Sequence, residues 1–113
     1  MRKVIELHVG LTSRHETMCR NDGKPIKSFI YGDGVENPLD WENHRKVAQE
    51  WIDAQEWQLS EPFNVEVIVY VTGLVALTTA FLYCWSKTKP TPFRLTLMHY
   101  NIKTGQYEAE KWT

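Results

Sequence analysis

The stretch that most constrains the fold is residues 65–74, where a β-branched run ends at Thr72-Gly73 and an apolar helical stretch follows. β-Branched side chains favour extended backbone, and glycine is a common strand breaker. A strand that breaks at a glycine and enters a helix is half of a βαβ unit. The chain is therefore expected to build a parallel sheet, in which ligands bind beyond the carboxyl ends of the strands.

Three further segments carry strand signals. Residues 4–9 alternate between an apolar and a more polar face, residues 93–100 form a second alternating run, and residues 107–112 follow a turn at 103–106. Because helical stretches separate the first three strands, we expect one α/β domain over residues 1–113. Its predicted architecture is a small Rossmann-like, mostly parallel sheet with flanking helices and a C-terminal antiparallel β-hairpin.

Two helices are predicted. The first has Asn37 as its cap and Pro38 in its first turn, and ends near Trp57. Five of its residues fall on or near one stripe at helical spacing, the side expected to face the core: Trp41, Ala48, Trp51, Ile52 and Gln55. The second covers residues 74–85 and is apolar nearly all round, which indicates burial on several sides or a dimer contact. Between the first strand and the first helix, residues 21–23 (Asn-Asp-Gly) predict a turn, and residues 26–31 are compatible with a short strand in a hairpin across 14–31.

The net charge, the cysteines and the amino-terminal residues each argue against particular classes of protein. The net charge of −1 gives no field that would favour duplex nucleic acid. Cys19 and Cys84 do not make a disulfide framework, and no metal-ligand spacing is present, so neither a metal nor a cofactor is expected. The charged amino terminus does not read as a signal peptide, and the default expectation is a cytoplasmic protein.

A membrane-spanning interpretation has to be weighed against this one. Residues 67–86 contain no charged side chain over a length that can cross a bilayer. However, the first half of the run is β-branched, and Thr72-Gly73 interrupts its middle. A buried strand followed by a buried helix explains the same residues, so we do not expect a membrane partner.

Two strand ends resemble each other, and both end in a glycine followed by small or apolar residues. The first contains Gly10 and Thr12, with Arg14 shortly after, and the second contains Thr72, Gly73 and Leu74. Glycine lets a ligand approach the backbone closely, and the threonine hydroxyls can bind it. These six residues are the candidate ligand-binding set, although both glycines can equally do no more than end a strand.

Histidine supplies the candidate acid–base groups. His8 and His99 lie near the carboxyl ends of the two strands expected to flank the central one, and both can converge on one crevice if that order holds. We treat them as the candidate catalytic residues; the alternative is a pair of hydrogen-bonded structural histidines. A basic loop after the first strand, which includes Arg20 and Lys24, can close over an anion or simply be solvated.

The strand end Tyr70-Val71-Thr72-Gly73 before a helix resembles one motif of CRISPR-associated Rossmann-fold (CARF-like) sensor domains. Domains of that family bind cyclic oligoadenylates at strand ends across a homodimer, and some cleave them. The resemblance covers residues 65–74, and Leu74 and Val75 stand where relatives usually have a second glycine and often a basic residue. The tail at 99–107 is similar to small phage or CRISPR-locus accessory proteins. The resemblance implies a cyclic oligoadenylate as ligand.

Together these observations favour a homodimer that binds a nucleotide-type anionic ligand at its strand ends. Phosphodiester cleavage in such a site needs no metal, because the ligand's own 2′-hydroxyl can attack while histidine or backbone donors stabilise charge. The alternative is a non-enzymatic, phage- or defence-associated protein-interaction module that uses its apolar helix and tryptophans. The sequence leaves open which of the two holds and whether any reaction is catalysed.

Overall fold

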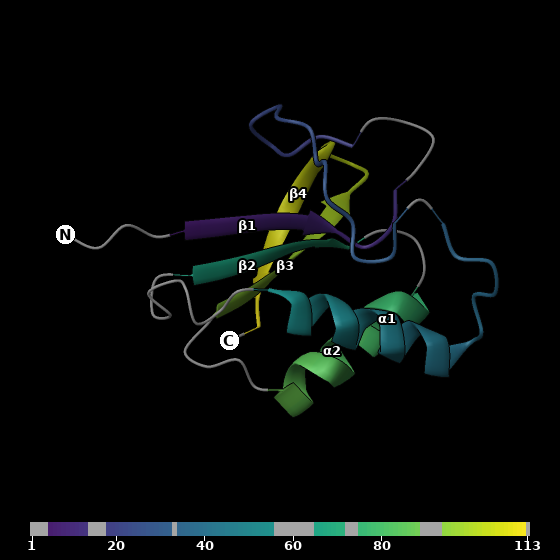
Figure 1. Cartoon of the computed structure of the whole chain (residues 1–113). Coiled ribbons are helices and arrows are strands. Elements are labelled where there is room, and N and C mark those ends of the chain that lie inside the picture. The colour runs from purple at the N-terminus through teal and green to yellow at the C-terminus, as the bar shows by residue number, and fades with distance from the viewer. Residues whose placement is uncertain are drawn as a thin grey trace.

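The structure is a computed structural model that describes residues 5–13, 18–32, 34–55, 65–71, 75–88 and 94–112. Two helices and four strands lie in these segments (Figure 1). In chain order they are β1 (Ile5–Gly10), α1 (Trp41–Ala54), β2 (Val65–Val71), α2 (Val75–Thr88), β3 (Arg94–Asn101) and β4 (Gln106–Lys111).

The four strands form one sheet in the order β1-β2-β3-β4. β1 and β3 both pair in parallel with β2, while β4 returns antiparallel to β3. Gly105, at φ 71°, provides the left-handed residue in the turn of this hairpin. The predicted α/β class, the parallel arrangement of the first three strands and the C-terminal antiparallel hairpin are confirmed.

Both helices pack on the same face of the sheet. Alternate residues of β2, Val65, Val67 and Val69, are buried in one core with Leu77 and Phe81 of α2. Helix α1 contributes Ala48 and Ile52 to that core, and Figure 1 shows the two helices together on one side of the strands. This follows from the strand order, because right-handed crossovers that all step in one direction place every helix on one face. The strand order does not reverse direction within the described sheet. In a doubly wound sheet, such a reversal creates the crevice in which the ligand binds.

The opposite face of the sheet is covered by the long connection after β1. Ile68 and Tyr70 of β2 are buried against Ile26, and Met18 and Phe29 pack on the same cluster. The side-chain amide of Asn21 fastens this connection to β4, since it accepts from the Tyr107 N–H at 2.8 Å and donates to the Tyr107 carbonyl at 2.9 Å.

The short strand predicted at residues 26–31 is not formed as a strand of the sheet. These residues make one isolated parallel bridge, between Phe29 and Gly10, and Cys19 makes an isolated antiparallel bridge with Pro25. A tight turn at residues 20–24 does form, closed by the hydrogen bond from the Arg20 N–H to the Lys24 carbonyl at 2.8 Å. The predicted Asn-Asp-Gly turn is therefore confirmed, and antiparallel pairing across it extends to the hydrogen bond from the Ile26 N–H to the Met18 carbonyl at 2.8 Å. The pairing does not continue to residue 31, because residues 28–31 bond to Gly10 and Leu11 instead.

Helix α1 begins later than its sequence signals suggest. Asp40 is the N-cap, and its side chain accepts a hydrogen bond from the Asn43 N–H. Asn37, the predicted cap, instead accepts from the Leu39 N–H in a separate turn before the helix. The Asn37 side chain thus accepts a backbone hydrogen bond as a helix cap would, but this bond stabilises a turn before the helix. The predicted end at Trp57 lies outside the described residues, since α1 ends at Ala54.

The uncharged run at residues 67–86 is divided between β2 and α2. Within the described segments, neither helix combines the length and the hydrophobicity that a membrane span needs. The strand-then-helix interpretation of this run is confirmed.

Candidate functional site at the carboxyl ends of the parallel strands

The carboxyl ends of β1 and β2 meet at one edge of the sheet, as expected for parallel neighbours. In the pairing register Gly10 lies beside Tyr70, so the two strands end within a residue or two of each other. Helix α2 begins at Val75, only a few residues after β2 ends at Val71, and its first turn contains no acidic residue. Its first N–H groups therefore open at the same edge, where they favour an anion.

Four of the eight predicted site residues can be placed. Gly10, Thr12, His8 and His99 lie in described segments, whereas the predicted roles of Arg14, Thr72, Gly73 and Leu74 fall outside them.

Gly10 is not open to a ligand. A Cβ built on it would come within 2.6 Å of two ring atoms of Phe29, so the Phe29 ring occupies the space that the glycine leaves. The Gly10 N–H donates to the Ser28 carbonyl at 2.9 Å, and its carbonyl accepts from the Ile30 N–H at 3.0 Å. Thr12 also faces this connection, with its hydroxyl donating to the Gly32 carbonyl at 3.2 Å. The glycine serves the packing of the chain's own loop, which is neither the ligand contact nor the plain strand end that the sequence suggested.

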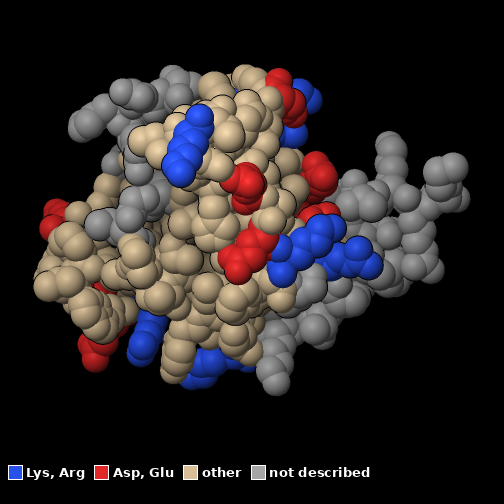
Figure 2. All heavy atoms as spheres, turned by 180° about the vertical axis from the view of Figure 1, so that it is seen from behind, with Lys and Arg blue, Asp and Glu red and all other residues tan. Residues whose placement is uncertain are grey.

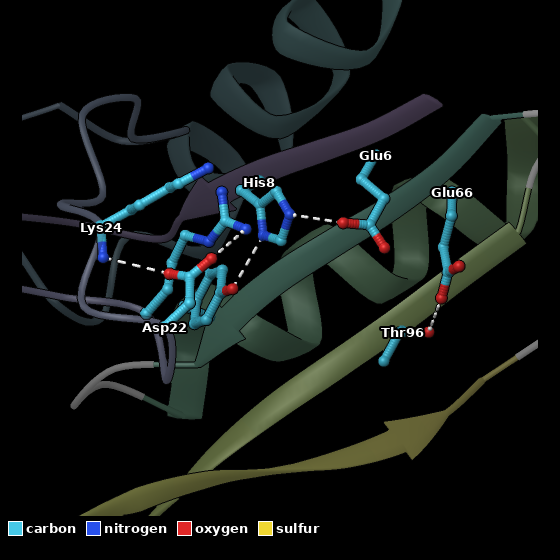
Figure 3. Close-up of polar contacts among 8 residues, drawn as sticks. Glu6, His8, Asp22, Lys24, Glu66 and Thr96 are labelled. Atoms are coloured by element: carbon cyan, nitrogen blue, oxygen red, sulfur yellow. Dashed lines mark hydrogen bonds and ion pairs between the residues drawn. The ribbon is translucent and has the colours of Figure 1, made fainter. Parts of the chain in front are cut away.

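His8 lies in a chain of hydrogen bonds on the face of the sheet away from the helices (Figure 3). Its Nε2 is 3.0 Å from Oε1 of Glu6 and its Nδ1 is 2.8 Å from the Tyr70 hydroxyl. A carboxylate only accepts, so Nε2 carries the proton and, in a neutral ring, Nδ1 accepts from Tyr70. Burial raises the pKa of the Tyr70 phenol, which keeps that hydroxyl protonated as a donor. Both ring nitrogens of His8 are engaged, and general-base catalysis would require one of these bonds to break.

His99 does not join His8. It is in register with Val71, which points to the helix-covered face, whereas His8 is in register with Ile68 on the opposite face. The Nε2 of His99 lies 2.7 Å from Oε1 of Glu110 on β4, and its side chain is half exposed. The two histidines therefore lie on opposite sides of the sheet and do not form one catalytic pair.

The turn at residues 20–24 brings cationic groups near Tyr70, close to the carboxyl end of β2 and on the face of the sheet away from the helices. Arg20 pairs with Asp22 at 2.7 Å, and the Lys24 backbone N–H donates to the same carboxylate. This backbone hydrogen bond, followed by Arg20, lowers the pKa of the Asp22 carboxyl. Figure 3 shows the Lys24 side chain extending away from Asp22, so that its ammonium does not pair with that carboxylate. Over the surface seen in Figure 2, acidic and basic side chains alternate among uncharged ones, without one continuous basic field.

A hollow between α1 and α2 was not anticipated from the sequence. Trp41, predicted to lie on the buried stripe of α1, is instead 48% exposed, and the buried stripe consists of His44, Ala48 and Ile52. Trp41 and Arg45 line a groove of about 540 Å³ together with the amino-terminal part of α2. The helical spacing of apolar residues does not determine which of two adjacent helix faces packs on the sheet. The exposure of Trp41 could therefore not be predicted from the sequence.

No protein-family model, curated protein or solved structure matches this chain. Over the described residues, the structure contains no group of three or more histidine, cysteine, aspartate or glutamate side chains arranged to hold a metal ion.

Proposed function

We propose that the protein binds a nucleotide-type anionic ligand at the carboxyl edge of its parallel sheet, with a cyclic oligoadenylate as the most specific candidate. The observation that supports this most is the start of α2 immediately beyond the carboxyl end of β2, with no acidic side chain in its first turn. Free backbone N–H groups at a helix start favour phosphate. Lys24 adds one positive charge from the turn at residues 20–24, where Arg20 is already paired with Asp22.

The hydrogen bonds of His8 favour a binding role for the site over a catalytic one. Neither His8 nitrogen is free, and His99 lies on the other face of the sheet. Any phosphodiester cleavage would then rest on the ligand's own 2′-hydroxyl and on backbone donors that stabilise the developing charge.

A thermal-shift panel tests the proposal, with inorganic phosphate, nucleosides, mononucleotides, linear oligoadenylates and cyclic oligoadenylates as probes. A ligand at a hundredfold excess over its Kd stabilises the folded state by about 2.7 kcal/mol. For a domain of this size that raises Tm by roughly 10 °C. A folded protein whose Tm no nucleotide raises at millimolar concentration contradicts the proposal.

A substitution at the edge provides the matched test. Thr72→Val keeps the side-chain shape and removes one hydroxyl, and loss of a hydrogen bond to a charged ligand lowers affinity about tenfold or more. Thr88→Val is the control, because Thr88 ends α2 at its far end. Equal affinity of the parent and Thr72→Val for the ligand found in the panel would remove Thr72 from the site.

The competing class is a protein-interaction module, and one observation favours it. Four large apolar side chains on or next to the helices are substantially exposed: Leu39, Trp41, Val75 and Tyr83. Exposed aromatic and aliphatic side chains of this kind are typical of protein interfaces. The nucleotide panel separates the two classes, since an interaction module has no reason to respond to it.

A further inference from the structure

The groove between α1 and α2 has the size of a small-molecule site. Its volume is about 540 Å³, within the range of roughly 300–1,000 Å³ that ligand sites occupy. It is lined by Trp41, Arg45, Val75, Ala76, Thr79, Ala80 and Tyr83. Because α2 begins just beyond the carboxyl end of β2, the groove opens at the same end of the molecule as the strand ends.

The formal charge among the described lining residues of the groove is positive. Arg45 supplies it, and no aspartate, glutamate or lysine is among these residues. The Arg45 guanidinium carbon lies 4.2 Å from the centre of the Tyr83 ring, which holds this side chain against the wall. No acidic side chain in the described part of the chain forms an ion pair with Arg45 within 4.0 Å. Its charge is therefore available to an anion.

Aromatic side chains from both helices line the groove, and small side chains of α2 lie among them. Trp41 at one side is 48% exposed and Tyr83 at the other is 43% exposed, so both rings present surface to solvent. Ala76 and Ala80 lie between them on α2 and carry only methyl side chains. A flat ring can rest on such a surface and stack against Trp41, a contact that is tolerant of the ring's identity.

We infer that this groove binds a planar aromatic ring that carries an anionic group, with the ring against Trp41 and the anion at Arg45. The inference deepens the proposed function and rests on it for the natural ligand, which would be the base and phosphate of one nucleotide unit. The volume, the unopposed cation and the exposed rings together support a small ligand of this chemistry.

The experiment measures binding of two probes to the whole chain by fluorescence and calorimetry. One is AMP, and the other is 8-anilinonaphthalene-1-sulfonate, which carries a flat naphthalene ring with a sulfonate and is not a nucleotide. Arg45→Gln should weaken both about tenfold or more through loss of a charged hydrogen bond. Trp41→Ala should weaken both about fivefold or more. Lys46→Gln and Trp112→Ala are the matched controls, because both residues are exposed and neither lines the groove. Circular dichroism establishes that each variant is folded.

The outcomes separate the groove from the proposed function. Weakening of both probes by the two groove substitutions, with unchanged controls, supports the groove. If the sulfonate behaves this way and AMP does not bind, the groove stands and the nucleotide proposal fails. If AMP binds but responds to Thr72→Val and not to Arg45→Gln, the groove is refuted and the proposed function stands. A dimer that Trp41→Ala converts to a monomer would assign the groove to a second copy of the chain and overturn the inference, as would failure of both probes to bind.

Discussion

Substitution of Gly10 by alanine tests whether this glycine packs against the chain's own loop or leaves room for a ligand. A Cβ at position 10 would lie 2.6 Å from two ring atoms of Phe29, whereas ordinary contact begins at 3.4 Å. The ring would have to move by nearly 1 Å while the backbone on both sides of Phe29 stays hydrogen-bonded to Gly10. We expect Gly10→Ala to destabilise the fold.

The magnitude follows from two opposing terms. Overpacking of a tight contact costs about 1–3 kcal/mol. Against this, replacing glycine by alanine restricts the unfolded chain and stabilises the fold by about 0.4–1 kcal/mol. The net loss in the parent should be about 1 kcal/mol, within a range of roughly 0–2.6 kcal/mol. In a Phe29→Ala background the clash disappears, and Gly10→Ala should become neutral or slightly stabilising.

Urea unfolding followed by circular dichroism measures the four corners of this double-mutant cycle. Gly34→Ala is the control, because a Cβ there would meet nothing within 4 Å. If Gly10→Ala stabilises the parent and the Phe29→Ala variant alike, position 10 is open space. That result would refute the packing interpretation and restore Gly10 as a candidate ligand contact.

Three further predictions concern stability and association. Tyr31→Phe removes a hydroxyl that lies 3.2 Å from both the His44 and the Leu77 carbonyl oxygens, and should cost about 1–2 kcal/mol in urea unfolding. Burial raises the pKa of the Tyr31 phenol, so the unfolded chain loses this proton first. Stability should therefore fall above about pH 10, and the substitution should make that fall shallower; an unchanged pH profile would contradict this. Thr96→Val removes the hydroxyl that donates to Oε1 of Glu66 at 2.8 Å, and should lower stability by about 1–2 kcal/mol in thermal unfolding, with no loss counting against this bond. Light scattering should report a dimer of twice 13.3 kDa, and a mass near 13.3 kDa at micromolar concentration would refute it.

The sheet was predictable because its signals are local. The β-branched run of β2 and the alternation in β3 specify strands, and the helices between them require parallel crossovers. The apolar character of α2 was also evident from the sequence, but the sequence did not show which elements cover the helix. The helix is covered by the sheet on one side and by α1 on another, as Leu77 and Phe81 share a core with Ala48 and Ile52. Val75 and Tyr83 of this helix stay exposed, and the dimer stays a prediction.

The site was less predictable because it depends on contacts between distant residues. Phe29 fills the space beside Gly10, although nineteen positions separate the two residues in the sequence. No local sequence pattern predicts this contact. The separation of His8 and His99 depends on strand register, since a shift of one residue would exchange the two faces. Trp41 gave a helical-spacing signal but lies outside the buried stripe.

The most direct test of ligand binding at the carboxyl edge is an amide chemical-shift titration of the isotope-labelled protein with cyclic oligoadenylates of several ring sizes. The proposed function predicts saturable shifts concentrated at the start of α2 and at the turn of residues 20–24, on either side of the carboxyl end of β2. Lys111 and Thr88, at the ends of β4 and α2 that lie away from that edge, should not move. Shifts confined to those distant ends, or none at saturating concentration, would contradict it.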